Sequence, residues 1–265
     1  MRSAKSDSSY SVPALHRTLD IIEALIGQRP LTVSELHRQF KIPKSSVYAI
    51  LQTLKARGYV SKDDMDQYSL SLRLFTLGIS LIENLDLRKG THALLEELTQ
   101  KAQLTGHIGV LDGKEAVYID KAEVLTAVRL TTWLGRRVPL HSTSMGKAML
   151  AFLPEAEVDA VLGKGPLQKL TSKTITNPAQ LKLELAKVRA QGYAISNEEN
   201  EIGVRAVGAP IFGSTGRPVA AVNLGASALN MKSKDLPRLG ALVRNYAEKI
   251  SGVSHLSKFR QDSFM

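Results

Sequence analysis

Polar and basic side chains suited to nucleic acid gather in the segment "KSSVYAILQTLKAR", residues 44–57. Its apolar residues recur at the spacing i, i+3, i+4 and i+7, which predicts a helix with one buried face. That apolar face consists of Val47, Ile50, Leu51 and Leu54. The remaining hydroxyl, amide, phenol and cationic side chains can bond base edges or bind phosphate. The segment therefore predicts a helix that packs on one side and contacts DNA with the other.

The roles expected for these side chains follow from their positions along the helix. Lys44, Ser45 and Ser46 lie at its N-terminus, where side chains reach base edges and backbone N–H groups can meet phosphate. Tyr48 can contact a phosphate or a thymine methyl group, and Gln52 can pair with adenine. Cations near the helix end and two residues on the preceding helices are expected to contact the DNA backbone. These are Lys55, Arg57, Arg17 and Ser34.

Two predicted helices precede the segment and position it. The first is expected near residues 13–27, with an apolar stripe formed by Leu15, Leu19, Ile22 and Ile26. The second begins at a capping box, in which Thr32 and Glu35 each bond the other's backbone N–H. Pro43 then disfavours a helical conformation at Ile42 and suits the first turn of the next helix. Two short helices joined by a brief turn indicate a helix-turn-helix.

Two short strand patterns follow and flank the polar turn "DDMDQ". They predict a hairpin, so that the module becomes a winged helix-turn-helix over residues 11–70. Asp63, Asp64 and Asp66 in the turn would be repelled by phosphate, whereas Lys62 favours contact. The tip of the wing is therefore expected to stay off the DNA or to touch it marginally. A winged helix can also serve protein contacts, but the polar face of the helix argues against that use.

The charge of the chain favours an anionic partner near its N-terminus. The formal net charge is +10, and residues 1–62 carry ten Lys and Arg against four Asp and Glu. Residues 63–265 carry 25 against 21, so the basic excess per residue is several times denser in the first segment. This distribution is typical of a nucleic-acid-binding module, and a basic, solvated surface with no partner is the alternative.

The 265-residue chain contains no cysteine, which excludes disulfides, thiolate nucleophiles and cysteine-based zinc sites and fits a reducing compartment. No apolar run approaches the roughly 20 residues that cross a bilayer. The first eleven residues, "MRSAKSDSSYS", lack the apolar core of a secretion signal. A cytoplasmic protein with no membrane partner is therefore expected.

Residues 71–103 carry two helical patterns that connect the winged helix to the rest of the chain. Their apolar positions are Leu74, Leu77, Leu81, Leu87, Leu94 and Leu98. Apolar stripes on connecting helices often mediate dimerisation, and helix-turn-helix proteins usually bind two half-sites as dimers. This segment is therefore expected to hold linker and dimerisation helices. Packing of the leucines on the next domain is the alternative.

Residues 104–255 predict an α+β domain built on an antiparallel sheet, not a Rossmann fold. "HIGVLDGKEAVYIDKAE" indicates two strands around Asp112-Gly113, and "AVRLTTW" indicates a third. "YAIS", "VRAVGAPIF" and "PVAAVNLGA" are further strand patterns. Helices are expected at "HSTSMGKAMLAFL", at "NPAQLKLELAKVRAQG" with Asn177 as N-cap and Gly192 as its end, and near residues 234–252.

Partial matches to catalytic motifs fail, so no enzyme activity, catalytic residue, cofactor or metal is expected. Gly146-Lys147 lacks the earlier glycine and the following hydroxyl residue of a phosphate-binding loop. "STSMG" has Ser142 where a nucleophile elbow needs glycine. The six histidines are scattered, and none has another at metal-ligand spacing. His107 and His141 are expected to be structural or pocket-lining residues.

The helix start "HSTSMGK" favours a binding pocket instead. It offers free backbone N–H groups and the positive end of a helix dipole, which suit a carboxylate. Its hydroxyls can bond the oxygens of a sugar or an acid. The alternative is that Ser142 merely caps the helix.

Four motifs stand in a specific order: "LTVSELHRQFKIPKSSVYAILQTLKARGYV", "YSLSLRLFTLG", "GRRVPLHSTSMGKAMLAFLP" and "GYAISNEENEIGVRAVGAPIF". In that order and at that spacing, the chain resembles the IclR family of bacterial transcriptional regulators from about residue 11 to residue 252. The resemblance implies an N-terminal winged helix and a C-terminal GAF-like domain that binds a small-molecule effector. It also implies homodimers that assemble into dimers of dimers.

The resemblance further implies an effector site between the sheet and the start of the "GKA" helix. Its lining, carried over by position, would be Ala127, Leu130, Val138, Ser144, Met145, Ser196, Asn197, Val204 and Ala206, with Glu198 nearby. Ser144 and Met145 would supply backbone N–H groups. Members that bind small keto acids have Asp in place of Ser196 and Gly-Ala in place of Ser144-Met145, so Met145 is expected to shrink or reshape the pocket. "GRRVPL" and "RLTTWLG" resemble members that regulate sugar-acid or aromatic-acid catabolism.

These features predict a DNA-binding transcriptional regulator, a repressor of a catabolic operon, that binds a double-stranded operator and is controlled by a small organic acid. Binding of the acid would shift the dimer between arrangements that space the two recognition helices differently. The alternatives are an effector-independent DNA-binding protein and an enzyme with a vestigial winged helix.

Overall fold

A computed structural model describes residues 11–26, 29–84, 86–124 and 130–253. The chain divides into two compact units, Met1–Leu81 and Ile82–Met265, and each has a hydrophobic core of its own. The boundary between them falls inside helix α4 (Leu72–Asn84). Among the described helices, none is both long and apolar enough to cross a bilayer.

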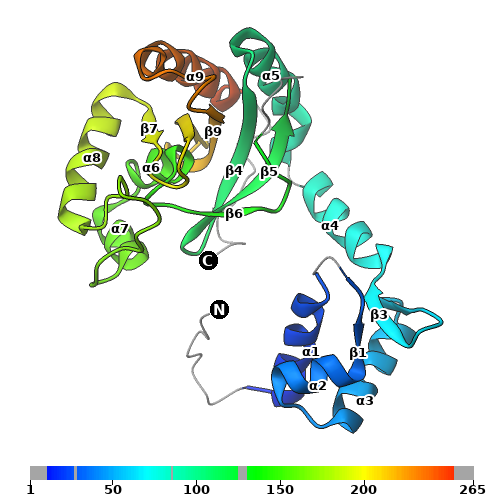
Figure 1. The fold of residues 1–265 in the computed structure, drawn as a ribbon. Helices are drawn as coiled ribbons and strands as arrows, with labels where there is room; N and C mark the ends of the chain where they lie inside the picture. Colours follow the sequence, from blue (N-terminus) through cyan, green and yellow to red (C-terminus); the bar gives the residue numbers. More distant parts are fainter. Residues whose placement is uncertain (1–10, 27–28, 85, 125–129, 254–265) are drawn as a thin grey trace. The chain divides into compact units, whose positions relative to one another are not determined.

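The first unit is a helix-turn-helix with a small wing (Figure 1). Its helices are α1 (Pro13–Ala24), α2 (Val33–Phe40) and α3 (Lys44–Ala56). Its strands are β1 (Leu31–Thr32), β2 (Val60–Lys62) and β3 (Gln67–Leu70), in the antiparallel order β1-β3-β2. The hairpin of β2 and β3 confirms the predicted wing. Strand β1 is too short to leave a sequence pattern, and it adds a third strand beside β3.

Local sequence signals set the ends of the helices in this unit. The capping box at the start of α2 is confirmed, because Thr32 accepts a bond from the N–H of Glu35 and Glu35 accepts one from the N–H of Thr32. The hydrogen bond from the Thr32 backbone is the largest effect that lowers the pKa of Glu35 to about 2. Pro43 is the N-cap of α3, so it directly precedes the first helical turn in which it was expected. Gly58 follows α3 with a φ of +76°, which glycine adopts without strain.

The core of the first unit contains the apolar face of α3. Val47, Leu51 and Leu54 are buried as predicted, and Ile50 is half-buried beside them. The opposite face of α3 is left open to solvent over most of its length.

The apolar stripe predicted for α1 is wrong. Three of its residues are exposed and one is half-buried, namely Leu15, Leu19, Ile26 and Ile22. Ile21 and Leu25 enter the core instead. Because apolar residues stand in adjacent pairs near the end of this helix, periodicity alone left two faces available, and tertiary packing chose the other one.

The connecting helices α4 and α5 (Asp86–Ala102) differ in how their apolar residues are used. On α5, Leu98 is fully buried and Leu94 is half-buried against the core of the second unit, as in the alternative of domain packing. Among the α4 side chains that the structure describes, the large apolar ones exposed to solvent are Leu72, Phe75 and Leu77. Leu81 and Leu87 lie on these helices, and their side chains are not among those that the structure describes.

The second unit is built on a six-stranded sheet in the order β6-β5-β4-β9-β8-β7. Its strands are β4 (Thr105–Asp112), β5 (Glu115–Ala122), β6 (Arg137–Pro139), β7 (Ala194–Asn197), β8 (Val204–Phe212) and β9 (Pro218–Ser227). Every neighbouring pair is antiparallel. The sheet confirms the α+β fold class and excludes the parallel sheet of a Rossmann fold.

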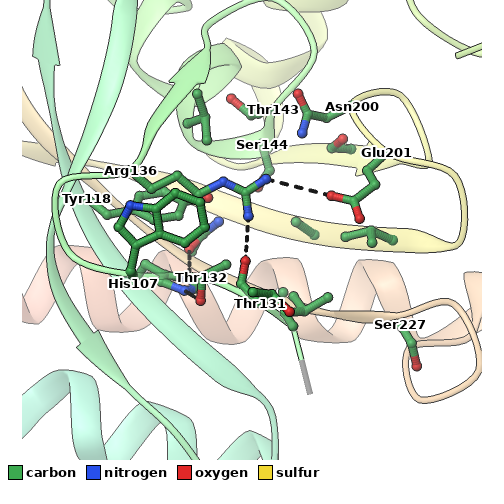
Figure 2. Close-up of a pocket in the computed structure, with 18 residues that line it drawn as sticks. His107, Tyr118, Thr131, Thr132, Arg136, Thr143, Ser144, Asn200, Glu201 and Ser227 are labelled. Carbon is green, nitrogen blue, oxygen red and sulfur yellow. Dashed lines mark hydrogen bonds and ion pairs between the residues drawn. The ribbon is translucent and has the colours of Figure 1, made fainter. Parts of the chain in front are cut away.

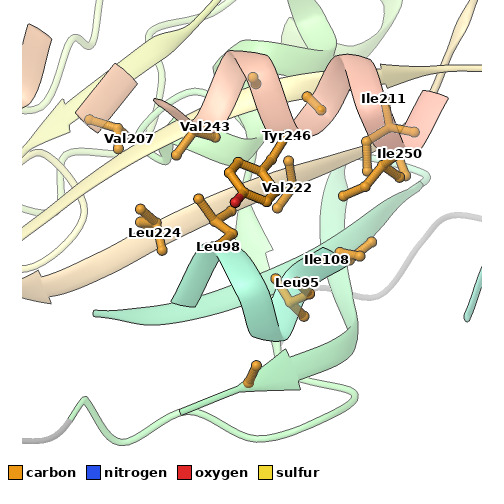
Figure 3. Close-up of a cluster of buried hydrophobic side chains, with 14 of the residues drawn as sticks. Leu95, Leu98, Ile108, Val207, Ile211, Val222, Leu224, Val243, Tyr246 and Ile250 are labelled. Atoms are coloured by element: carbon orange, nitrogen blue, oxygen red, sulfur yellow. The ribbon is translucent and has the colours of Figure 1, made fainter. Parts of the chain in front are cut away.

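Helices cover both faces of this sheet (Figure 1). Helix α9 (Leu236–Ser251), preceded by the short 3-10 helix η2 (Ser233–Asp235), packs with α5 on one face. Figure 3 shows the buried apolar side chains between these helices and the strands, including Leu98, Val222 and Tyr246. On the other face lies α6 (Ser144–Leu150), which packs against α8 (Pro178–Gln191). Helix α7 (Glu155–Leu162) contributes Val158 to that second cluster.

The alternation of side chains along the strands separates a core from a polar cavity. On β9, Val222 and Leu224 lie in the core beneath α9. Asn223 and Gly225, which alternate with them, line a pocket on the opposite face. Strand β4 does the same with Ile108 in the core and His107 in the pocket, so the sheet itself forms the pocket floor.

Two elements of this unit differ from the sequence prediction. "AVRLTTW" forms no strand in its described residues 130–133, and residues 127–129 lie outside the described part. The strand that follows β5 at this edge of the sheet is β6 instead, and its three residues pair with β5. Helix α7 follows Pro154 and has no strong periodicity to announce it. By contrast, α8 is confirmed at both ends: Asn177 accepts a bond from the N–H of Ala179 at 2.8 Å, and Gly192 follows with a φ of +80°.

Candidate functional site

The DNA-facing residues predicted on α3 lie on its solvent side. Lys44, Ser45, Lys55 and Arg57 are exposed, and Tyr48 is 53% exposed although it is aromatic. Ser46 is half-buried. A tyrosine ring left in solvent beside lysines has no packing role, so this face is free for a partner.

A cleft runs between the starts of α2 and α3 and the wing. Its lining is Thr32, Val33, Ser34, Lys44, Ser45, Tyr48, Lys62, Asp66 and Tyr68. It therefore brings together four of the residues predicted to contact DNA: Ser34, Lys44, Ser45 and Tyr48. Arg17 is exposed on α1 and does not line this cleft.

Contacts with the wing engage two residues whose roles the sequence left open. The amide nitrogen of Gln52 donates a hydrogen bond to the hydroxyl of Tyr68 at 3.1 Å, which holds its side chain against β3. The ammonium of Lys62 pairs with Asp66, which raises its pKa. Asp63 accepts bonds from the backbone N–H groups of Met65 and Gln67, so this carboxylate shapes the turn.

The second unit contains a cavity of about 460 Å³ between the sheet and the start of α6, a size suited to a small ligand. Figure 2 shows the side chains around it. Its lining is His107, Tyr118, Leu130, Thr131, Thr132, Trp133, Arg136, Val138, Thr143, Ser144, Ser196, Asn200, Glu201, Val204, Ala206, Asn223, Gly225 and Ser227.

Most of the residues proposed for the effector site meet in this cavity. They are Leu130, Val138, Ser144, Ser196, Val204 and Ala206. Met145 and Asn197 do not line it, and Ala127 lies outside the described residues. The Oδ1 atom of Asn197 instead accepts a bond from Arg205 at 2.7 Å.

Met145 was expected to shrink or reshape the pocket, but it does not line the cavity. Its side chain is fully buried in the apolar cluster under α6. Its sulfur would lie 2.3 Å from a Cβ placed on Gly109, so the missing side chain of that glycine makes the room for it. Gly208 plays a similar part on β8, where a Cβ would come within 3.0 Å of the Ser144 backbone.

The loop before α6 fixes the hydroxyls of the pocket. Thr143, not Ser142, caps α6, because its Oγ1 accepts a bond from the N–H of Gly146 at 3.1 Å. Ser142 instead donates to the side chain of Asn200 at 3.0 Å. Ser196 donates to the carbonyl of Ser142 at 2.7 Å, which ties β7 to the same loop.

Ser144 has a buried hydroxyl with no hydrogen-bond partner among the described residues. The residue is fully buried and lines the cavity. A buried hydroxyl without a partner is unfavourable, so its Oγ is available to a ligand oxygen.

A histidine and its partners form the polar floor of the pocket. The Nδ1 of His107 lies 3.1 Å from Oδ1 of Asn223, and its Nε2 lies 2.8 Å from Oγ1 of Thr132. The ring stacks on Tyr118, with centroids 4.4 Å apart. Burial lowers the pKa of His107 to about 4 and raises that of Tyr118, so both rings are neutral near pH 7 and act as hydrogen-bonding groups.

The mouth of the pocket holds charged and aromatic residues that sequence reasoning did not assign. Arg136 lies over the ring of Trp133, with the guanidinium carbon 5.3 Å from the centroid. It donates to the carbonyl of Thr131 at 2.8 Å and pairs with Glu201 at 3.7 Å (Figure 2). The consecutive arginines of "GRRVPL" were the available signal, but the sequence did not show which of them turns inward.

The arrangement suits the binding of a small polar ligand. The described residues hold no group of His, Asp and Glu able to bind a metal ion. The cavity combines one guanidinium, neutral hydrogen-bonding groups and apolar walls, which are the elements needed to orient a small polar ligand.

Both units match known protein families. Residues 79–252 match the family "Bacterial transcriptional regulator IclR C-terminal", and residues 14–64 match the "IclR helix-turn-helix domain". The chain is 35% identical over 242 residues to the HTH-type transcriptional regulator KdgR of Escherichia coli (strain K12), which covers 91% of this chain and 92% of that protein.

Solved structures share the fold over nearly the whole chain. The crystal structure of the Thermotoga maritima IclR has a TM-score of 0.75 and 34% identity, and covers 89% of this chain and 96% of that one. An IclR homolog from Microbacterium hydrocarbonoxydans, complexed with 4-hydroxybenzoate, has a TM-score of 0.78 and 23% identity, and covers 92% and 98%. The family matches span both units, and the relatives are transcriptional regulators, not enzymes. The chain therefore belongs to the IclR family of DNA-binding transcriptional regulators.

Proposed function

We propose that this regulator is a repressor of a catabolic operon. A small organic acid, bound in the pocket of the second unit, controls its affinity for DNA. Repression needs only that the protein occupy its operator, and the exposed face of α3 is suited to occupancy. Lys44, Ser45 and Tyr48 would contact bases and nearby phosphates, while Lys55 and Arg57 would contact the backbone.

The unpartnered Ser144 hydroxyl carries the pocket proposal. It opens onto a cavity that also holds Arg136, so a ligand with a carboxylate and at least one further oxygen would satisfy both groups. The neutral polar floor around His107 suits hydroxyl groups. These features favour a hydroxylated acid, of the sugar-acid or aromatic-acid type.

We propose that the protein acts as a homodimer, with a dimer of dimers as the larger assembly. Large apolar side chains stand in solvent on α4, where Phe75 is 65% exposed and Leu72 is 79% exposed. Exposed apolar residues on a connecting helix are suited to association with a second copy. The lack of cysteine supports a cytoplasmic location.

Thermal denaturation against a panel of acids tests the ligand proposal. The panel contains gluconate, benzoate and 4-hydroxybenzoate, each beside its neutral amide or alcohol. A ligand that binds only the folded state raises the midpoint of unfolding, so at least one acid should do so and its neutral partner should not. If no acid in a broad panel raises the midpoint, while the protein still retards its own upstream DNA, the effector-independent alternative holds.

A further inference from the structure

The segment "NEENE" after β7 carries three carboxylates, and the structure ties two of them firmly. Glu198 and Glu199 each bind a lysine ammonium at 2.8 Å. Glu201 is held more loosely, because its Oε2 lies 3.7 Å from Nη2 of Arg136 and its side chain is 57% exposed. Glu201 is thus the carboxylate of this segment that can move at least cost.

Arg136 is fixed by contacts that do not involve Glu201 (Figure 2). Its Nη1 donates to the carbonyl of Thr131 at 2.8 Å, and its guanidinium rests over Trp133. Its backbone carbonyl accepts a bond from the N–H of Tyr118 at 3.1 Å, which anchors it to β5. The cation is therefore pre-positioned at the pocket, and only its anionic partner is loose.

Arg136 and Glu201 are the formally charged side chains among the described residues that line the cavity. Their charges cancel, so an entering anion meets a cation that is already engaged. A partly exposed ion pair at 3.7 Å contributes little to stability. A carboxylate in bidentate geometry on a guanidinium, by contrast, forms two short hydrogen bonds. A ligand carboxylate is therefore able to replace the Glu201 carboxylate.

We propose that Glu201 is a built-in competitor for Arg136, which the carboxylate of the ligand displaces on binding. This inference rests on the proposed function, since it concerns the same pocket. Arg136 is the group that recognises the carboxylate of the acid. Glu201 is the group with which that carboxylate must compete, so it lowers the affinity for every anionic ligand. Weak or neutral ligands leave the Arg136–Glu201 pair in place and do not occupy the site productively.

The chain reports on this exchange by itself. Trp133 is its only tryptophan, and the guanidinium of Arg136 lies over that ring. Tryptophan fluorescence of the full-length protein is therefore followed while acetate, glycolate or gluconate is added at constant ionic strength. Acetamide serves as the neutral isostere of acetate. The proteins compared are the wild type, Glu201→Gln and Arg136→Gln, with Glu155→Gln as a matched loss of charge at an exposed site remote from the pocket.

The wild type should give a saturable change with the acids and none with acetamide. Glu201→Gln should lower the half-saturating concentration by about five-fold, which corresponds to about 1 kcal/mol, the upper end for a surface pair. Arg136→Gln should abolish the change, and adding Glu201→Gln to it should restore nothing. Glu155→Gln should titrate like the wild type. Glu201→Asp, which keeps the charge, should stay within two-fold of the wild type.

Equal half-saturation in the wild type and Glu201→Gln overturns the proposal, as does the absence of any response to all three acids in both proteins. Failure of the proposed function would look different. In that case the acids would titrate Trp133 with the expected order of variants, but none would change binding to the upstream DNA.

Discussion

Lys147 and Glu199 form an ion pair in the interior of the second unit, with the Lys147 ammonium 2.8 Å from both carboxylate oxygens. The lysine is fully buried, and the glutamate side chain is 11% exposed. The pair joins α6, one turn after Ser144, to the segment that carries Asn200 and Glu201. It thus fastens together two walls of the pocket.

Lys147→Met is expected to destabilise the protein by about 3–5 kcal/mol, because it leaves the Glu199 carboxylate buried without its cation. Urea denaturation measures this loss. The double variant Lys147→Met/Glu199→Gln should recover a clear part of it, since the remaining group is neutral. A loss below about 1 kcal/mol in the single variant would show that the pair is not a fastening point.

Gly146→Ala is expected to destabilise the second unit although alanine favours helices. A Cβ at this position would lie 2.3 Å from the Cα and the carbonyl oxygen of Leu140, and backbone atoms cannot give way as a flexible side chain can. We expect a loss of about 1–3 kcal/mol or more, against the gain of about 1 kcal/mol from helix propensity. Gly165→Ala, outside any helix, is the control for adding a methyl group without a clash, because nothing lies within 4 Å of its Cβ, and its stability should be close to that of the wild type.

His107 should make the stability of the protein fall between about pH 6.5 and pH 4. In the folded state its pKa is lowered from 6.5 to about 4, chiefly by burial, so the unfolded chain binds a proton in this range before the folded chain does. The free energy of unfolding is therefore unaffected by His107 above about pH 6.5, and it decreases by up to about 3 kcal/mol on acidification to about pH 4. His107→Gln, which cannot titrate, should lose correspondingly less stability over the same range. Parallel stability curves for the two proteins, measured by urea denaturation at several pH values, would contradict the assignment.

Lys44→Ala should weaken operator binding and reduce the slope of log affinity against log salt by about 1, as expected for the loss of one phosphate contact. Titrations of labelled DNA over a range of salt concentrations measure both quantities. Ser45→Ala should weaken binding with little change in the slope, because its hydroxyl carries no charge. Lys234→Ala, an exposed lysine of the second unit, is the control and should leave affinity and slope unchanged. An unchanged slope for Lys44→Ala would remove this lysine from the interface.

Much of the fold was predictable because local signals agreed with tertiary packing. The capping box of Thr32 and Glu35 and the N-cap of Asn177 each satisfy backbone groups within a few residues, so sequence alone sufficed. The strands β8 and β9 were predictable because they are long and rich in buried apolar residues. The stripe of α1 failed because two apolar faces were available and only packing chose between them.

The candidate site was less predictable, because it is assembled from segments far apart in the chain. Ser144 and Ser196 follow from the family resemblance, and the structure brings both to the cavity. Arg136 and Glu201 are separated by a long stretch of sequence, and no periodicity links them. Met145 shows the converse, since its neighbour enters the pocket while its own side chain turns into the core.

Fluorescence anisotropy of a labelled duplex from the region upstream of the gene tests whether a ligand in the pocket controls the affinity of the protein for DNA. We expect the wild type to bind at physiological salt, and an acid that raises its melting midpoint to weaken this binding by about 5-fold to 150-fold, the usual range of coupling between sites. Ser144→Leu, which fills the pocket, should abolish this response. If every acid that stabilises the protein leaves binding of the duplex unchanged, or if Ser144→Leu responds fully, the pocket does not control DNA binding.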